Sequence, residues 1–221
     1  MQARNDDLRA MRRINDVQRR IFAGMLMALD RGVGRVRDSL EQHGLTRRTL
    51  VVFLSDNGGP TQELTSSNAP LRGGKGSLYE GGIRVPMVWS LPSRLPTGWV
   101  EDRPVLSLDI AATAYDLAGR PADETLDGKS LLDWVDGPPS DHPHQHIFWR
   151  MSGGKMAFRS GNWKIVRPKR GEPFELYHLA GDVSESRNLV GQQPQKLKDL
   201  ITRYLATESQ MPKPLELPKA R

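Results

Sequence analysis

Residues 50–89 have the sequence LVVFLSDNGGPTQELTSSNAPLRGGKGSLYEGGIRVPMVW, in which two apolar runs enclose a loop rich in glycine. The first run, residues 49–54, is typical of a buried strand and ends directly before Ser55, Asp56 and Asn57. In open α/β sheets, ligands bind outside the carboxyl ends of the strands, so a carboxylate and an amide at this tip indicate a binding site. The second run, residues 85–90, predicts another buried strand beyond the loop.

The segment before the first strand has the pattern of one long helix. Apolar side chains recur every three or four residues over 6–43, which predicts a helix with a single apolar stripe. Gly32 and Gly34 weaken this helix and predict a break or kink near 32–34, whereas Gly44 predicts its end. A helix that leads straight into a strand is typical of α/β layers, so we predict an α/β fold.

Beyond residue 90 the chain changes character. We expect a helix over 106–117, with Ser107 as its N-cap and Gly119 just past its end. Residues 120–145 are rich in Pro, Gly and Asp and predict a boundary between two subdomains. Short apolar runs separated by turn residues then predict an antiparallel meander of three or four strands, over 146–151, 155–159, 163–167 and 175–179.

These elements predict the organisation of the whole chain. Residues 1–125 form the α/β core segment that carries both loops. Residues 126–210 form a small antiparallel sheet with an amphipathic helix over 194–205, and residues 211–221 form a loose tail.

Composition narrows the classes of function. The 221 residues include no cysteine, which excludes disulfides, thiolate metal sites and a cysteine nucleophile. No apolar run approaches the roughly 20 residues that span a bilayer. The start, MQARNDDLRAMRR, lacks the apolar core of a signal peptide, and we expect no membrane partner. The first 50 residues hold eleven arginines and six acidic residues, but these arginines are dispersed along the expected helix without interleaved aromatic residues, so we expect no nucleic-acid partner.

Two short motifs carry the candidate chemistry. Asp56 and Asn57 offer a carboxylate and a carbonyl oxygen, which are hard ligands suited to Ca²⁺ or Mg²⁺. Two adjacent ligands cannot complete a coordination shell, and Asp-Asn-Gly-Gly taken alone is more typical of a tight turn. Lys75 lies between Gly74 and Gly76, where close backbone approach and an ammonium group suit a tetrahedral oxyanion. The loop lacks the P-loop pattern, and a loop lysine taken alone is more often solvated.

Taken together, these motifs resemble a known family. The order DNGG, then N-x-P-L-R-G-G-K-G-S-x-x-E-G-G-x-R-V-P, is similar to the second half of a type I sulfatase of the alkaline-phosphatase superfamily. The similarity extends to ALDRGVG at 28–34, RSGNWK at 159–164 and ELYHL at 175–179. The resemblance implies the C-terminal portion of an alkaline-phosphatase-like sandwich, followed by the small meander.

The resemblance also assigns roles to the two motifs. It implies that Asp56 and Asn57 ligate a divalent cation, Ca²⁺ rather than Mg²⁺, and that Lys75 contacts the sulfate. These roles replace the turn and the solvated lysine as our interpretation. Arg72 and Arg84 are candidates to brace the glycine loop.

The sequence departs from the family pattern in one important respect. Sulfatases attack with a formylglycine made from the Cys or Ser of a C/S-x-P-S-R motif in the first part of the protein, and we identify no nucleophile or acid–base residue here. Residues 90–94 spell S-x-P-S-R, but they follow a strand and the metal pair instead of preceding that pair and opening a helix. The early paired aspartates and the upstream histidine and lysine of the sulfate pocket are also missing.

The resemblance therefore implies an incomplete segment of a metal-assisted, formylglycine-dependent sulfuric ester hydrolase, inactive alone, whose substrate is a sulfated sugar or an aryl sulfate. Its partner would be the missing N-terminal half, which would carry the formylglycine. Two alternatives stay open: a non-catalytic remnant or module that binds an anion or a metal, and a related phosphatase or phosphodiesterase. The absence of histidine between residues 50 and 90 disfavours the phosphatase class.

Asn68, which lies between the two motifs, is a candidate to line the pocket of this site.

Overall fold

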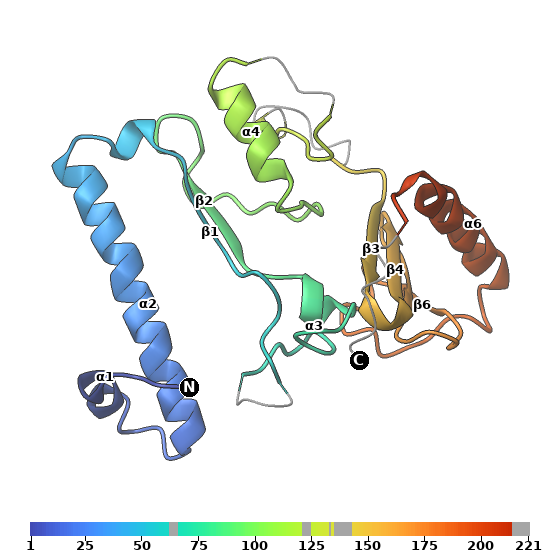
Figure 1. The fold of residues 1–221 in the computed structure, drawn as a ribbon, viewed down its shortest axis with the longest axis horizontal. Coiled ribbons are helices and arrows are strands. Elements are labelled where there is room, and N and C mark those ends of the chain that lie inside the picture. Colours follow the sequence, from blue (N-terminus) through green and yellow to red (C-terminus); the bar gives the residue numbers. More distant parts are fainter. Residues whose placement is uncertain (62–65, 121–124, 133, 135–142, 214–221) are drawn as a thin grey trace, which may run out of the picture. The chain divides into compact units, whose positions relative to one another are not determined.

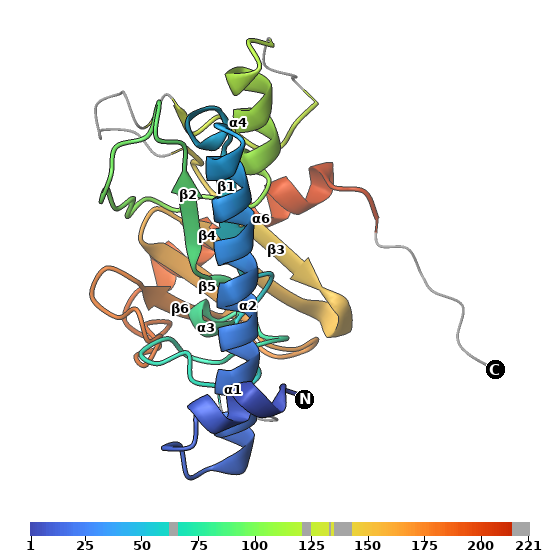
Figure 2. The same cartoon turned by 90° about the vertical axis from the view of Figure 1, so that its left-hand side faces the viewer.

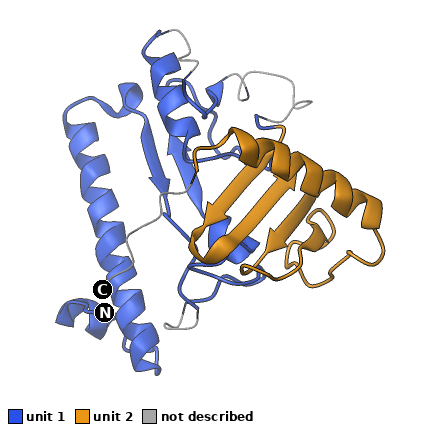
Figure 3. Ribbon diagram, turned by 45° about the vertical axis from the view of Figure 1, so that its right-hand side comes forward, with its two compact units in different colours: residues 1–144 blue, residues 145–221 orange. Residues whose placement is uncertain are grey.

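The computed structural model describes residues 1–61, 66–120, 125–132, 134 and 143–213. The chain forms two compact units, which we call unit 1, residues 1–144, and unit 2, residues 145–221 (Figure 3). The subdomain limits predicted at residues 125 and 210 stay a prediction, and most of the tail assigned to 211–221 lies outside the described residues. Within the described ranges, no helix combines the length and apolarity needed to cross a membrane.

Unit 1 combines helices with one pair of strands (Figure 1). In chain order the elements in the described part of this unit are α1 (Asn5–Ala10), α2 (Val17–Gln42), the 3₁₀ helix η1 (Thr46–Arg48), β1 (Val51–Leu54), α3 (Glu80–Ile83), β2 (Met87–Ser90) and α4 (Asp109–Leu117).

The single helix expected over 6–43 is in fact two helices, α1 and α2. The chain restarts at Asp16, whose side chain accepts a hydrogen bond from the Arg19 N–H at 2.6 Å and caps α2. The break predicted near 32–34 was wrong, because α2 runs through that region without interruption. Each glycine there costs only about 1 kcal/mol of helix propensity, which a helix of 26 residues tolerates. Gly44 has φ of 66° and follows the end of α2, as predicted.

The first residues of α4 differ from the prediction. Ser107 does not cap the helix, and no side chain bonds from its N-cap position. The buried carboxylate of Asp109 instead accepts a hydrogen bond from the Leu106 N–H at 2.6 Å. The Leu106 N–H precedes the helix, so this bond anchors the approach to α4 and does not replace an N-cap. Gly119, with φ of 63°, lies just past the end of the helix as expected.

β1 and β2 pair in antiparallel fashion and confirm both strands predicted around the glycine-rich loop. Both are shorter than the predicted runs. Leu54 pairs with Met87, so the carboxyl end of β1 and the amino end of β2 lie together where the glycine-rich loops begin. This end of the strand pair positions the candidate site.

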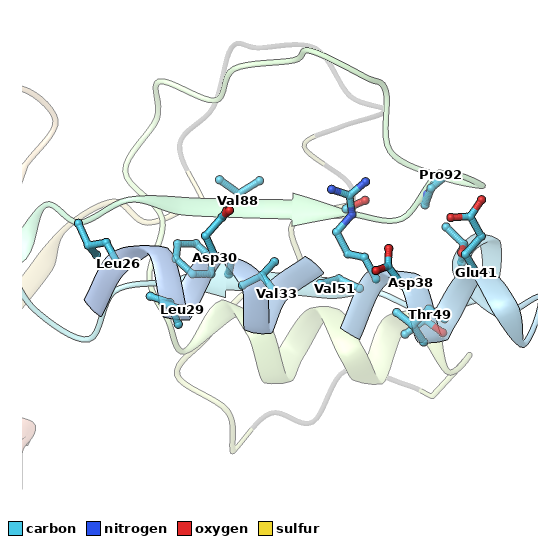
Figure 4. A pocket seen from close by; sticks show the side chains of 15 residues that line it. Leu26, Leu29, Asp30, Val33, Asp38, Glu41, Thr49, Val51, Val88 and Pro92 are labelled. Atoms are coloured by element: carbon cyan, nitrogen blue, oxygen red, sulfur yellow. The ribbon is translucent and has the colours of Figure 1, made fainter. Parts of the chain in front are cut away.

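One face of the strand pair borders a hollow of about 580 Å³ that α2 also lines (Figure 4). In Figure 2, α2 lies in front of the strand pair and runs roughly along it. Phe53 pairs with Val88 across the strands, and these side chains stay 40% and 60% exposed. The apolar side chains that α2 contributes to the hollow include Leu26, Leu29 and Val33. Contiguous apolar surface of this kind promotes association.

We therefore expect the isolated chain to self-associate, because this apolar face is left in water. Dynamic light scattering should show species larger than a monomer, and Val88→Lys should reduce their fraction. Val100→Lys is the matched control, since Val100 is 74% exposed and does not line the hollow. A monodisperse monomer for the unsubstituted chain would contradict the expectation.

Unit 2 is an antiparallel meander packed against a helix (Figure 1), and it confirms the predicted sheet with four strands in the order β3-β4-β5-β6. The helix α6 extends five residues beyond the range predicted for it. The elements of unit 2 are β3 (Ile147–Met151), the 3₁₀ helix η2 (Ser152–Gly154), β4 (Lys155–Ser160), β5 (Trp163–Arg167), β6 (Glu175–His178) and α6 (Pro194–Gln210).

The core of unit 2 forms between the sheet and α6. Phe158, Ile165 and Leu176 are cross-strand neighbours on β4, β5 and β6 and are fully buried. Leu200 and Tyr204 of α6 pack against them. The two residues are four positions apart, so they lie on one face of the helix, which confirms that this helix is amphipathic. The sequence placed Leu205 on that face, but Leu205 is exposed and Tyr204 is buried there instead.

A buried ion pair lies within unit 2. Lys164 Nζ is 2.8 Å from Glu185 Oε1, and both side chains are fully buried. Glu185 has φ of 50°, a left-handed conformation that residues other than glycine seldom adopt. Removing one partner of a buried pair generally costs about 3–5 kcal/mol, because the other charge is left unpaired away from water.

The turn that presents Glu185 is held by the carboxylate of Asp182. This carboxylate accepts hydrogen bonds from the N–H groups of Ser186 and Arg187, at 3.0 and 2.9 Å, and from the hydroxyls of Ser184 and Ser186, at 3.2 and 2.8 Å. Burial raises the pKa of Asp182, but the hydrogen bonds outweigh burial and lower the pKa to about 2.

This lowered pKa predicts how the stability of unit 2 depends on pH. A carboxylate whose pKa is depressed by folding contributes stability above its ordinary pKa of about 4 and loses it as the pH falls toward 2. The melting temperatures of the unsubstituted chain and of Asp182→Asn, followed by circular dichroism, should therefore differ most near about pH 6 and converge below about pH 4. A gap that stays constant down to about pH 2.5 would show that the carboxylate charge is not what holds the turn.

Candidate functional site

Asp56 and Asn57 follow the carboxyl end of β1 in a turn that is held on both sides. The Ser55 N–H donates to the Pro86 carbonyl at 3.1 Å, which extends the pairing of β1 with β2 by one residue. The Ser55 hydroxyl donates to the Asn57 carbonyl at 2.8 Å. The two side chains thus project from a fixed backbone at the strand tip, where the sequence analysis expected them.

Backbone contact among six glycines joins the loops of the site. Gly58 N–H donates to the Gly82 carbonyl at 3.0 Å. A Cβ added at Gly58 would lie 1.7 Å from the Gly81 oxygen, and one added at Gly74 would lie 2.3 Å from the Gly59 oxygen. No side chain fits at these distances, so glycine is required for steric reasons. We call this set the glycine cluster: Gly58, Gly59, Gly73, Gly74, Gly81 and Gly82.

The glycine cluster brings Lys75 to the turn that carries Asp56 and Asn57. The Lys75 N–H donates to the Gly59 carbonyl at 3.2 Å. Gly76, directly after the lysine, has φ of 82°, which lets the backbone turn away and leaves the lysine side chain exposed. Residues nearly 20 positions apart in the sequence therefore share one rigid support.

Asn68 is held in the middle of this arrangement. Its Oδ1 accepts from the Gly59 N–H at 3.0 Å, and its Nδ2 donates to the carbonyls of Gly59 and Gly73, both at 3.0 Å. The sequence predicted that Asn68 lines the pocket but gave no sign of these contacts. No local pattern could have shown them, because all three bonds go to loop backbone that becomes adjacent only on folding.

Arg72 and Arg84 contact residues at the start of α3. The guanidinium carbon of Arg72 lies 3.9 Å from the centre of the Tyr79 ring. Arg84 Nη1 lies 3.9 Å from Oε2 of Glu80, which is buried. Both arginines thus contact the segment that leads into Gly81 and Gly82. This placement agrees with the prediction that they brace the glycine loop.

The side chains of Asp56, Asn57 and Lys75 make no hydrogen bond or ion pair with any other described residue. A carboxylate and an amide oxygen are donors that a hard divalent cation prefers. Within the described ranges, no group of three or more His, Cys, Asp or Glu side chains could hold a metal ion. The pair therefore fits Ca²⁺ in kind, and a full coordination shell needs further ligands from outside this set.

Ser90, the first residue of the S-x-P-S-R string, lies at the wrong end of the strand pair for attack at this site. It pairs with Val51 at the start of β1, whereas the candidate ligands follow Leu54 at its end. Three steps along a strand amount to roughly 10 Å. This placement supports leaving Ser90 without a catalytic role.

Mixed helices and antiparallel strands, with these loops at a strand tip, place the chain in the alkaline-phosphatase-like class of folds. A family model named Sulfatase matches residues 3–120, and a model of the C-terminal part of N-sulphoglucosamine sulphohydrolase matches residues 74–210. The chain belongs to the sulfatase family. The resemblance inferred from the sequence is thereby confirmed.

Individual relatives agree with this assignment. Steryl-sulfatase of Mus musculus is 37% identical over 147 residues, which cover 62% of this chain and 24% of that protein. Arylsulfatase A of Homo sapiens is 33% identical over 199 residues, which cover 77% of this chain and 39% of that protein. The solved structure of Ps i-CgsB is 32% identical with a TM-score of 0.84, and the match covers 95% of this chain and 47% of that one. The same protein has been solved in complex with k-i-k-neocarrahexaose. This chain spans less than half the length of each of these three relatives.

The glycine cluster predicts the effect of a single methyl group. Gly58→Ala places a Cβ against the Gly81 carbonyl, so the turn that carries Asp56 must move, and we expect a loss of stability of about 2–4 kcal/mol. Gly32→Ala in α2 is the matched control, because its Cβ meets nothing within 4 Å, and it should stabilise the chain by about 0.5–1 kcal/mol.

Urea denaturation of both variants measures these two changes. Equal denaturation midpoints for Gly58→Ala and the unsubstituted chain would show that the loops are not in the contact described here.

Proposed function

We propose that this chain supplies two divalent-cation ligands and one sulfate-contacting cation to the active site of a sulfuric ester hydrolase. One observation carries the proposal: the Lys75 N–H bonds to the Gly59 carbonyl, so the lysine and the Asp56–Asn57 turn share one support. The three side chains have no partner among the described residues and are available to a ligand. Membership of the sulfatase family supports the reaction class.

The three residues have different proposed roles, which follow from the chemistry of their side chains. Asp56 and Asn57 would hold Ca²⁺, which accepts irregular oxygen shells more readily than Mg²⁺ does. A divalent cation bound there would draw charge from the sulfate oxygens as the ester bond breaks. The Lys75 ammonium would neutralise another sulfate oxygen as a compact point charge. A rigid support matters because such groups stabilise a transition state best when they need not reorganise.

The nucleophile is proposed to come from outside these 221 residues. The family attacks with a formylglycine made from a C/S-x-P-S-R motif, and the one such string here is at residues 90–94, where Ser90 lies at the far end of the strand pair. We therefore propose that the chain alone is inactive and that its partner is the segment of the enzyme that carries the formylglycine.

The proposed substrate is a sulfate ester of a sugar, an aryl group or a sterol. The names of two relatives, steryl-sulfatase and arylsulfatase A, support the ester class. The complex of Ps i-CgsB with k-i-k-neocarrahexaose supports a carbohydrate.

Hydrolysis of 4-nitrophenyl sulfate tests the proposal. The chain would be co-expressed with the segment that bears the C/S-x-P-S-R motif and assayed with Ca²⁺. Lys75→Ala and Asp56→Ala should each lower kcat/KM on the order of 10²–10³-fold. Lys169→Ala and Asp127→Ala, which remove exposed charges elsewhere, are the matched controls and should stay within about two-fold of the unsubstituted pair.

The other outcomes separate the alternatives. Hydrolysis by the chain alone would place the nucleophile within it and contradict the proposed division of the site. Binding of Ca²⁺ or sulfate with no activity in the combined protein would favour a non-catalytic binding module. Faster cleavage of 4-nitrophenyl phosphate than of the sulfate would favour a phosphatase.

A further inference from the structure

We propose that Asn68 is a positioning residue that fixes the separation between the cation ligands and the sulfate-contacting lysine. The inference rests on the roles proposed for Asp56, Asn57 and Lys75. Among the described residues, the Asn68 side chain makes no hydrogen bond to any of these three side chains, and it binds the backbone between them.

The carboxamide of Asn68 uses both of its N–H bonds and its oxygen. One N–H donates to the Gly59 carbonyl and the other to the Gly73 carbonyl, while Oδ1 accepts from the Gly59 N–H. Gly59 is therefore held through both of its polar backbone groups. It lies two residues after Asn57, and Gly73 lies two residues before Lys75. Asn68 thus bridges the two halves of the proposed site at nearly equal spacing.

The Gly59 carbonyl couples the two halves directly. Its oxygen accepts from Asn68 Nδ2 at 3.0 Å and from the Lys75 N–H at 3.2 Å, which uses both of its lone pairs. Any shift of Gly59 therefore changes the position of Lys75 as well. The glycine cluster sets how closely the loops approach, and backbone hydrogen bonds such as that from the Lys75 N–H to the Gly59 carbonyl join them. Asn68 adds three directional bonds that fix the position of Gly59 relative to Gly73.

The backbone of Asn68 is itself anchored. The Leu71 N–H donates to the Asn68 carbonyl at 2.8 Å and closes the turn that leads into the lysine loop. The side chain is half-buried, so water competes less for its hydrogen bonds than at an exposed site. The bridge therefore has a fixed base.

Only an amide of this length can make all three bonds. Aspartate at position 68 would keep the acceptor but would set a carboxylate against two carbonyl oxygens, with no hydrogen to donate. Glutamine would keep every hydrogen-bonding group but would place it one methylene further out. Asn68→Asp and Asn68→Gln consequently alter the bridge without touching the proposed ligands.

The effect of bound Ca²⁺ on the affinity for methyl sulfate measures how firmly Asn68 holds the two halves of the site together. Calorimetric titration with methyl sulfate would be done with and without saturating Ca²⁺, on the chain co-expressed with the segment that bears the C/S-x-P-S-R motif. In the unsubstituted chain, bound Ca²⁺ should tighten methyl sulfate binding by about five-fold or more, because the opposite charges are held at a fixed separation. In Asn68→Asp each ligand should still bind, but the coupling should fall below about two-fold.

Control variants separate positioning from a merely structural role. Asn15→Asp makes the same change at an exposed loop position and should leave the coupling intact. A merely structural role would lower the melting temperature of Asn68→Asp and leave its coupling at the unsubstituted value, which would overturn the proposal. If Asn68→Asp does not fold, Asn68→Gln provides the test, with coupling reduced but not abolished as the expected result and full coupling as the contrary one.

Failure of the underlying functional proposal is a distinct outcome. In that case the unsubstituted co-expressed protein binds neither Ca²⁺ nor methyl sulfate, or binds them with affinities that Asp56→Ala and Lys75→Ala leave unchanged. Binding and coupling that are intact in the unsubstituted chain and equally intact in Asn68→Asp would overturn the role of Asn68 alone.

Discussion

The carbonyl oxygen of Gly59 accepts hydrogen bonds from Lys75 and from Asn68, and this approach is possible only where the loop residues have no Cβ. A methyl group at Gly58 or Gly74 would overlap a facing carbonyl oxygen. Backbone held this closely behaves as a single rigid piece, although its residues are far apart in sequence. The candidate chemistry of the chain depends on that contact, because it joins a carboxylate at a strand tip to a lysine in a loop.

Charged side chains serve different purposes at two places in the chain. In unit 2, Lys164 and Glu185 are fully buried and form an ion pair with each other, so neither charge is available to a ligand. In unit 1, Asp56 and Lys75 are exposed and unpaired among the described residues, so their charges remain available to a ligand. The contrast follows from the free energy of desolvation. A buried charge is stable only beside a partner, whereas an exposed charge is hydrated and can bind a ligand.

Much of the fold followed from local pattern. The strands at 49–54 and 85–90 and the four strands of the meander were predicted close to their observed places, because alternation and turn residues act over a few positions. The exceptions are helix ends, which depend on individual side-chain hydrogen bonds and not on the periodicity of apolar residues. Asp16 caps a second helix where periodicity predicted one continuous helix, and Ser107 does not cap α4. The hollow beside β1 could not be predicted from the sequence, since its shape depends on how α2 lies against the strands.

In the candidate site, too, some features could be predicted from the sequence and others only from the folded structure. Asp56, Asn57 and Lys75 could be named from the sequence, because their motifs keep a fixed order and spacing that resembles sulfatases. That Lys75 and the Asp56–Asn57 turn share one support, and that Asn68 bridges them, could be learned only from the folded chain. Residue types and spacings are properties of the linear chain. Hydrogen bonds between loops that meet only after folding are not, because they depend on where the rest of the chain holds each backbone.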